Sequence, residues 1–199
     1  TTGCRNTVVG FQAGLDNTTG NENAFFGRLA GCENTTGGAN TGIGSSSFSS
    51  NTTGCENAFF GRLAGCENTT GRNNTGIGSS SFNSNTTGNN NVAIGHSSLE
   101  SNTTADDGIA IGYVALAQNT TGAMNVAVGN YSLDANTTGA SNTAMGVSAL
   151  SANTTGAKNV AMGTSALAGN TTGNSSIAIG FRAMQVSTTA EGNVVIGEE

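Results

Sequence analysis

The sequence predicts an all-β fold: a parallel β-solenoid, or β-roll, with 17 residues per coil and about twelve coils. Three observations predict it. A Thr-Thr pair recurs every 17 residues without insertion or deletion, each copy has a glycine at the same place, and a short apolar segment precedes that glycine. Because so short a period has no room for a helical hairpin, each copy is expected to form one coil.

The repeat organises the whole chain as one domain, residues 1–199. Eleven full coils and a twelve-residue remnant begin at Thr1, Thr18, Thr35, Thr52, Thr69, Thr86, Thr103, Thr120, Thr137, Thr154, Thr171 and Thr188. The composition, with 31 Gly, no Pro and 9% charged residues, resembles that of a disordered low-complexity chain. A disordered chain does not need glycine in strict register, whereas stacked coils do.

Each coil is expected to start at a corner, because Asn and Gly in the Asn-Thr-Thr-Gly group favour tight turns. A five-residue strand such as 91–95 follows, in which Val92 and Ile94 face one way and Ala93 the other. Both faces are apolar, so both are expected to be covered. A second short segment, such as 96–99, then carries one inward apolar residue.

A glycine ends the predicted strand in every copy. This position requires either a positive φ or a backbone approach too close for a Cβ atom. We expect these glycines to be structural: Gly10, Gly27, Gly44, Gly61, Gly78, Gly95, Gly112, Gly129, Gly146, Gly163, Gly180 and Gly197.

Large and small residues alternate between two positions of the coil. Phe59 at mid-strand accompanies Gly65 six residues later, whereas Gly76 accompanies Phe82, and later coils pair Ala with Leu. Such compensation predicts that the two positions share one packed layer. It also divides the domain into Phe-, Gly- and Cys-containing coils (1–85) and Ala/Leu coils (86–199).

Charge and hydropathy exclude several classes of function. The net charge is −6, and the six basic residues are far apart, so no nucleic-acid-binding patch is expected. No apolar run is long enough to span a bilayer, and no signal peptide begins the chain. Because the chain starts inside a repeat without Met, we expect it to be part of a longer polypeptide.

Few residues are candidates for catalysis or metal binding. His96 is the only histidine, and no Ser/His/Asp or metal-binding constellation is evident around it. Asp106 and Asp107 at one corner suggest at most a weak Ca²⁺ site, since the calcium-binding solenoid motif is missing. The chain is therefore not expected to be an enzyme or to need a cofactor.

Four cysteines occupy two positions that flank the same corner: Cys4, Cys32, Cys55 and Cys66. An even number of cysteines in a surface protein favours disulfides over free thiols. Their connectivity, within or between chains, does not follow from the spacing.

Ten corners also match the sequon for N-glycosylation. They begin at Asn17, Asn34, Asn51, Asn68, Asn85, Asn102, Asn119, Asn136, Asn153 and Asn170. Turn chemistry with stacked Asn and Thr explains the same motif without sugar. Regular Thr columns occur in ice-binding solenoids too, but adjacent Thr residues point in opposite directions, which disfavours that alternative.

The pattern Asn-Val-Ala-Ile-Gly, followed by small residues and an Asn-rich corner as in 91–99 and 159–167, resembles the head repeats of trimeric autotransporter adhesins (YadA-like heads). It is similar to repeats of phage tail fibres as well. The resemblance covers the whole chain, which differs in its longer corner and in the phenylalanines of its first half. It implies a left-handed β-roll, three chains side by side, and a place on the bacterial surface or a virion tail fibre.

Packing considerations also favour association. Each coil offers about three apolar side chains against the backbone entropy of 17 residues, so a lone thin roll is marginal. Identical chains can cover each other's second apolar face. The expected function is a structural or adhesive segment, head or shaft, of an extracellular homotrimeric fibre, whose further partners would be a host matrix or a cell-surface glycan.

Overall fold

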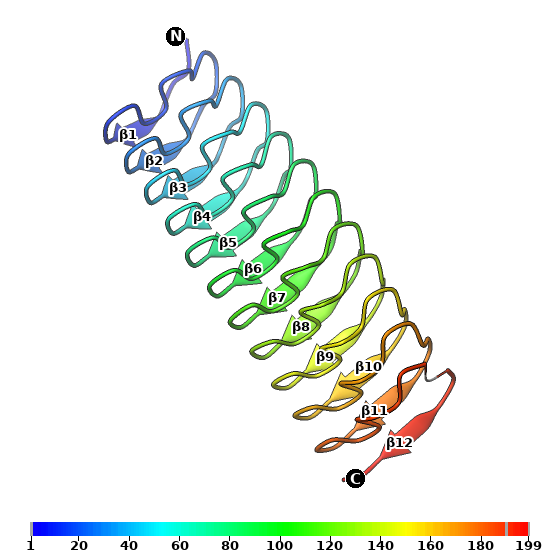
Figure 1. Cartoon of the computed structure of the whole chain (residues 1–199). Helices are drawn as coiled ribbons and strands as arrows, with labels where there is room; N and C mark the ends of the chain where they lie inside the picture. Colours follow the sequence, from blue (N-terminus) through cyan, green and yellow to red (C-terminus); the bar gives the residue numbers. More distant parts are fainter. Residues whose placement is uncertain (1, 190, 199) are drawn as a thin grey trace.

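The computed structural model describes residues 2–189 and 191–198. It confirms an all-β parallel solenoid with one short strand per coil, and the elements of the described residues are strands alone. Figure 1 shows the coils stacked into a rod with the two termini at opposite ends. The strands are β1 (Thr7–Val9), β2 (Ala24–Phe26), β3 (Thr41–Ile43), β4 (Ala58–Phe60), β5 (Thr75–Ile77), β6 (Val92–Ile94), β7 (Ile109–Ile111), β8 (Val126–Val128), β9 (Thr143–Met145), β10 (Val160–Met162), β11 (Ile177–Ile179) and β12 (Val194–Ile196).

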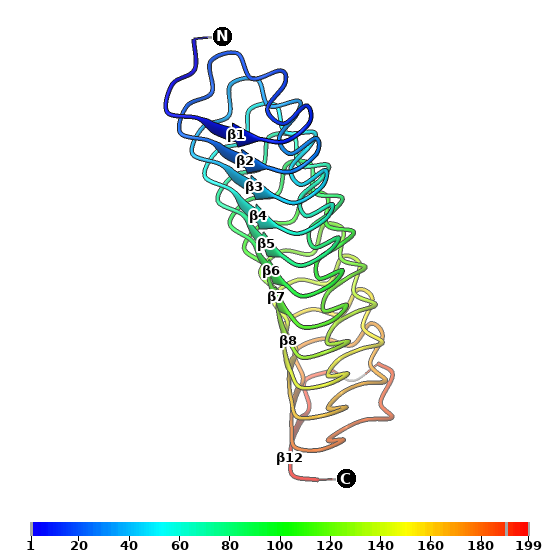
Figure 2. The same ribbon diagram turned by 90° about the vertical axis from the view of Figure 1, so that its left-hand side faces the viewer.

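These strands form one 12-stranded parallel sheet in sequence order. Each residue pairs with the residue 17 positions later, as Ala93 does with Ala110. Viewed at 90° to Figure 1, the strands lie along one side of the rod and the turns along the other (Figure 2). Each strand has three residues rather than the expected five, because the glycine that follows leaves the extended conformation.

The segment after the glycine is a series of turns that still bonds to the adjacent coils. The Leu99 amide donates to the Ala115 carbonyl at 3.0 Å, and the Thr86 amide donates to the Thr103 carbonyl at 3.0 Å. These ladders outside the sheet satisfy backbone groups that a thin coil would otherwise leave unpaired.

The glycine that ends each strand has a positive φ, and in most coils the backbone of the next coil also approaches it too closely for a Cβ atom. Gly112 has φ of 140°, and a Cβ atom there would lie 2.5 Å from the carbonyl oxygen of Gly129 in the next coil. The conformation and the contact are both incompatible with ordinary side chains. Gly112 thus meets both of the conditions that the sequence suggested for this position.

The Phe/Gly alternation is a packing rule, as predicted. Phe59 is fully buried, and a Cβ atom on either Gly65 or Gly76 would lie 2.6 Å from its ring. One ring thus fills the space above a glycine of its own coil and a glycine of the next coil. The rings of Phe48 and Phe82 flank it, with centroids 5.1 and 6.0 Å from its own.

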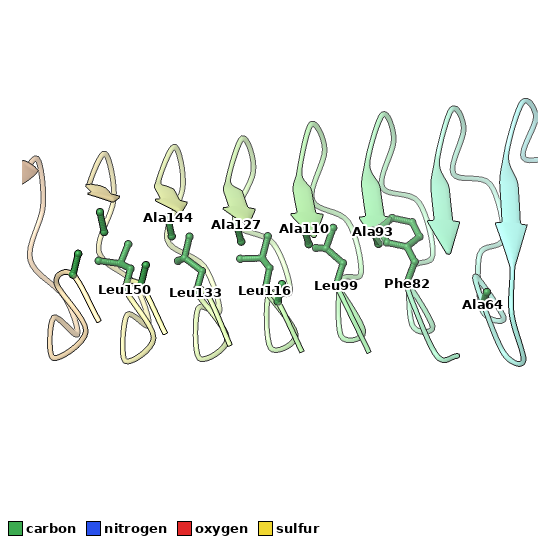
Figure 3. Close-up of a cluster of buried hydrophobic side chains, with 14 of the residues drawn as sticks. Ala64, Phe82, Ala93, Leu99, Ala110, Leu116, Ala127, Leu133, Ala144 and Leu150 are labelled. Carbon is green, nitrogen blue, oxygen red and sulfur yellow. The ribbon is translucent and has the colours of Figure 1, made fainter. Parts of the chain in front are cut away.

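Later coils fill the same layer with smaller side chains. Figure 3 shows the alanines of the strands, such as Ala110 and Ala127, pointing toward leucines such as Leu116 and Leu133 on the facing turns. All four side chains are fully buried. A narrow apolar core thus runs along the inside of the sheet.

Two columns of buried asparagines form a second, polar interior. The corner column consists of the corner asparagines from Asn17 to Asn170, and the pre-strand column consists of the residue before each strand. In the corner column, Asn119 Nδ2 donates to Asn102 Oδ1 at 3.1 Å and to the Gly122 carbonyl at 3.0 Å. Each amide thus joins two coils and closes its own corner.

The pre-strand column is interrupted once by glycine. In a regular coil, the Asn142 amide N–H and side-chain Nδ2 both donate to Asn125 Oδ1, at 2.9 and 3.1 Å. At Gly108 there is no side chain to offer such an oxygen, so Asn125 Nδ2 donates to the Gly122 carbonyl instead and keeps its regular bond to the Gly139 carbonyl. The run from Asn6 to Asn91 and the run that starts at Asn125 are therefore separate.

Candidate functional site

The outer face of the sheet presents an apolar column along the rod. The third residue of each strand points away from the core and is always Val, Ile, Met or Phe, whereas a sheet face in water usually carries polar residues. We call this column the outer stripe: Val9, Phe26, Ile43, Phe60, Ile77, Ile94, Ile111, Val128, Met145, Met162, Ile179 and Ile196.

Exposure separates the stripe from the core. Ala93 in the middle of β6 is fully buried, whereas Ile94 beside it is 36% exposed and Met145 in β9 is 41% exposed. The first strand residue, such as Val92, is half-buried on the same outer side. Both strand faces are thus apolar, as expected, but within one chain only the inner face is covered.

A contiguous apolar column of this length is unusual on a protein that remains alone in water. Single exposed apolar residues are common on protein surfaces, but this column repeats at every coil. The stripe is the strongest candidate for a functional surface of this chain.

The side chains considered for chemistry lie apart from any enclosed site. His96 is exposed and stacks on Tyr113 with ring centroids 5.4 Å apart. Asp106 Oδ1 accepts hydrogen bonds from the Asn89 amide and Nδ2, and Asp107 Oδ1 accepts one from Asn90 Nδ2. Residues 2–189 and 191–198 contain no pocket and no group of three His, Cys, Asp or Glu side chains able to hold a metal ion.

The expected disulfides are not present in this chain. Cys4, Cys32, Cys55 and Cys66 are all free thiols. Cys32 and Cys66 stand in one column but two coils apart, roughly 10 Å at about 4.8 Å per coil, which exceeds the Cα separation of a disulfide. Ser49 lies between them and contacts Cys66 Sγ through its hydroxyl at 3.2 Å.

Burial affects the acidity of two side chains at the cysteine-bearing position after the inward Leu or Phe. The pKa of the Cys32 thiol is raised by burial and by the nearby Glu33 carboxylate. Burial also raises the pKa of Asp134, whose Oδ1 has no hydrogen-bond partner in the structure. These groups are exceptions in a coil whose other buried polar atoms are mostly paired.

The sequon asparagines are part of the interior. From Asn34 to Asn170 their exposed fraction is 0%, and Asn17 is 9% exposed. Their Nδ2 atoms donate hydrogen bonds to other residues, for example from Asn34 to Asn17 Oδ1 at 2.8 Å. A glycan on Nδ2 would disrupt these bonds and has no space, so the suggestion of glycosylation at these corners is corrected to a structural role.

The two threonines of each corner differ in the way that their alternation suggests. The first is half-buried in most coils and bonds to the next coil, as Thr137 Oγ1 does to the Thr154 carbonyl at 3.1 Å. The second, such as Thr138, is exposed. The corner therefore presents one exposed Thr column rather than two.

Sequence reasoning did not identify the left-handed residues that shape the turns. Besides the glycines, each coil has φ near +55° at three positions, represented by Asn90 (59°), Ser97 (53°) and Leu99 (49°). Leu, Ser and Val occur at these positions with no enrichment in Gly, so residue type carried almost no signal.

Among the described residues, no helix has the length and apolar character needed to cross a membrane. Comparison with known protein families, with curated proteins and with solved structures finds no match to this chain.

Proposed function

We propose that this chain is a structural or adhesive segment of an extracellular fibre, in which three identical left-handed rolls lie side by side and share their outer stripes. The single observation that carries the proposal is the outer stripe, an apolar face along the length of the rod that the described residues leave uncovered. Identical chains have stripes of identical length and spacing, so each can cover the stripe of another.

The magnitude of the effect depends on length. Full burial of a Val, Ile, Met or Phe side chain contributes about 1.5–3 kcal/mol, and roughly a third of each interior stripe residue remains to be buried. This leaves about 0.5–1 kcal/mol per coil, which is too little for one coil to overcome the entropic cost of association. Summed over a long rod, the stripe can hold chains together, and this explains the benefit of many equal coils.

The role is mechanical and multivalent rather than catalytic. A rod with shallow surfaces binds through many equal contacts, so avidity takes the place of a single tight site. The exposed Thr column offers one hydroxyl per coil for hydrogen bonds to a matrix polymer or a surface glycan. The segment would provide reach, rigidity and a repetitive polar surface.

The test compares the stripe with another exposed column. Sedimentation equilibrium should give the mass of three chains for the purified segment, and Ile94→Thr with Ile111→Thr should shift the mass toward one chain. Thr87→Ser with Thr104→Ser, on the exposed Thr column, is the control and should leave the mass unchanged. A wild-type chain that stays monomeric would overturn the proposal.

Adhesion is measured separately, on surfaces coated with matrix polymers or glycans. A trimer that binds these surfaces supports an adhesive head. A trimer that does not bind would exclude the adhesive role and leave that of a shaft.

A further inference from the structure

Two columns of residues border the outer stripe. The leading edge is the residue two positions before each strand from β1 to β11: Arg5, Glu22, Ala39, Glu56, Asn73, Asn90, Asp107, Met124, Ser141, Lys158 and Ser175. The trailing edge is the residue two positions after each of these strands: Phe11, Arg28, Ser45, Arg62, Ser79, His96, Tyr113, Asn130, Val147, Thr164 and Phe181.

In the second and fourth coils the two edges carry opposite charges. The second coil has Glu22 on its leading edge and Arg28 on its trailing edge, and the fourth coil has Glu56 and Arg62 in the same places. All four side chains are exposed. Between them, the third coil has Ala39 and Ser45, which are both uncharged. The second and fourth coils are the ones in which both edges of β1 to β11 carry a charge, whereas Arg5, Asp107 and Lys158 face an uncharged trailing-edge residue in their own coils.

These opposite charges do not pair within one chain. The strand separates the two edges by up to about 20 Å of extended backbone. The one ion pair found in residues 2–189 and 191–198 joins Arg5 Nη1 to Glu22 Oε1 at 2.7 Å, along the leading edge. The guanidinium groups of Arg28 and Arg62 thus have no carboxylate partner among the described residues of their own chain.

Side-by-side packing of parallel copies brings the edges together. When identical rods surround a common axis parallel to their length, every coil lies at the height of the same coil in its neighbours. If the stripes face the axis, the trailing edge of one chain meets the leading edge of the next. We propose that Arg28 and Arg62 of each chain pair with Glu22 and Glu56 of the neighbouring copy, and thereby set a parallel arrangement with zero stagger.

Other arrangements lose these pairs. A shift by one coil places Arg28 beside Ala39 and Arg62 beside Asn73. An antiparallel arrangement brings leading edge against leading edge, so acidic residues no longer meet arginines. The apolar stripe is nearly uniform along the rod and tolerates slippage, whereas the two charged coils do not. Electrostatic complementarity of this kind at an interface rim contributes specificity more than affinity.

The inference rests on the proposed lateral assembly and adds its direction and register. The experiment is a charge-reversal cycle with three variants. The first is Arg28→Glu with Arg62→Glu, the second is Glu22→Arg with Glu56→Arg, and the third combines all four changes. Arg is accommodated at the leading edge, because Arg5 has φ of 59° and Glu56 has φ of 61°.

A matched control reverses Glu33 and Glu67 to Arg. These two residues are exposed and belong to the same second and fourth coils, but they lie just before the corner, off both edges. The control changes the net charge as much as the second variant does. Far-ultraviolet circular dichroism should show that every variant keeps the wild-type fold.

Dissociation constants from sedimentation at low and high salt provide the readout. Each double reversal should raise the dissociation constant at least tenfold at low salt, and this difference should shrink at high salt. The fourfold variant and the Glu33/Glu67 control should stay within about threefold of wild type. Wild-type assembly with unchanged constants in both double reversals, or a fourfold variant as weak as the double ones, would overturn the inference and leave the proposed assembly standing.

A mixture of the two double charge-reversal variants tests how many chains form the assembly. Every contact between the two variants is complementary, but a ring of three must retain one contact between like chains. The mixture should therefore assemble less tightly than wild type. Full recovery would indicate an even-numbered ring, which keeps the charge pairing but contradicts the proposed trimer, and a monomeric wild type would overturn both.

Discussion

The shared layer of Phe59 and Gly65 can be tested by a double-mutant cycle. Phe59 is fully buried between two other rings, so Phe59→Ala should cost about 3–5 kcal/mol through lost contacts and a cavity. Gly65→Leu alone should also be destabilising, by roughly 1–3 kcal/mol, because its Cβ would lie 2.6 Å from the Phe59 ring.

The double variant should be more stable than Phe59→Ala alone. Later coils place Leu at this position next to Ala in the strand, and they accept it at a similar backbone angle, since φ is 59° at Gly65 and 53° at Leu116. Recovery should be partial, because the Phe59 ring also covers Gly76 in the next coil. We expect a coupling free energy of at least about 2 kcal/mol, which is large for a pair of substitutions.

Guanidinium unfolding, monitored by circular dichroism, gives the free energy of unfolding of the wild type, the two single variants and the double variant. The control combines Phe59→Ala with Gly31→Leu, the equivalent glycine two coils away, whose Cβ would meet Phe25 instead. The control effects should add within about 0.5 kcal/mol. Equal coupling in both cycles, or none in either, would refute the argument that Phe59 and Gly65 share one layer.

Three further predictions concern single side chains. Gly112→Val should reduce the free energy of unfolding by several kcal/mol, because φ is 140° there and the next coil leaves no space for a side chain. The melting temperature should therefore fall strongly for this variant, whereas Ala123→Val, at a variable position, should change it little. Burial raises the pKa of Asp134 above its ordinary value near 3.8, so the folded chain loses stability as pH rises from about 3.8 through the folded pKa. Asp134→Ser should therefore stabilise the fold more at pH 7 than at pH 3, measured by urea midpoints. Alkylation followed by mass spectrometry at pH 8 should modify the exposed Cys4 quickly and Cys32 slowly, because the pKa of Cys32 is raised.

Each of these predictions has a clear opposite outcome. Similar melting temperatures for Gly112→Val and Ala123→Val would contradict the close approach at that glycine. A stability difference for Asp134→Ser that is equal at pH 3 and pH 7 would show that the carboxylate is not the cause. A disulfide in the purified chain, or equal alkylation of Cys4 and Cys32, would contradict the thiol environments described above.

The strands and the apolar layer could be predicted because the copies of the repeat show different side chains filling the same space. The exchange of Phe59 with Gly65 for Gly76 with Phe82 shows in sequence that two positions share a volume. The inward orientation of Ala93 followed from simple alternation. These features depend on side-chain size and polarity, which a sequence displays directly.

Other features depend on backbone geometry that residue types do not reveal. Leu99 has φ of 49° although leucine rarely adopts this conformation, because stacking against adjacent coils determines its backbone. The corner asparagines suggested both turns and sugar acceptors, and only their burial decided between these roles. The separation of Cys32 and Cys66, by contrast, follows from the sequence, because 34 residues are two coils and about 4.8 Å per coil places the two thiols too far apart for a disulfide.

The interruption at Gly108 has a consequence for how the rod fails. In a stacked repeat protein, stability passes from coil to coil through nearest-neighbour contacts, so the weakest interface sets where cooperative unfolding stops. At this coil the pre-strand column has no side-chain oxygen to offer, so its interface with the next coil lacks a buried bond that other interfaces have, although the corner column continues through Asn119 and Asn136. Under tension or partial denaturation, the rod should break here into two blocks that melt separately. Gly108→Asn should join them into one unit, and it would turn a rod with a built-in weak point into one that resists force uniformly.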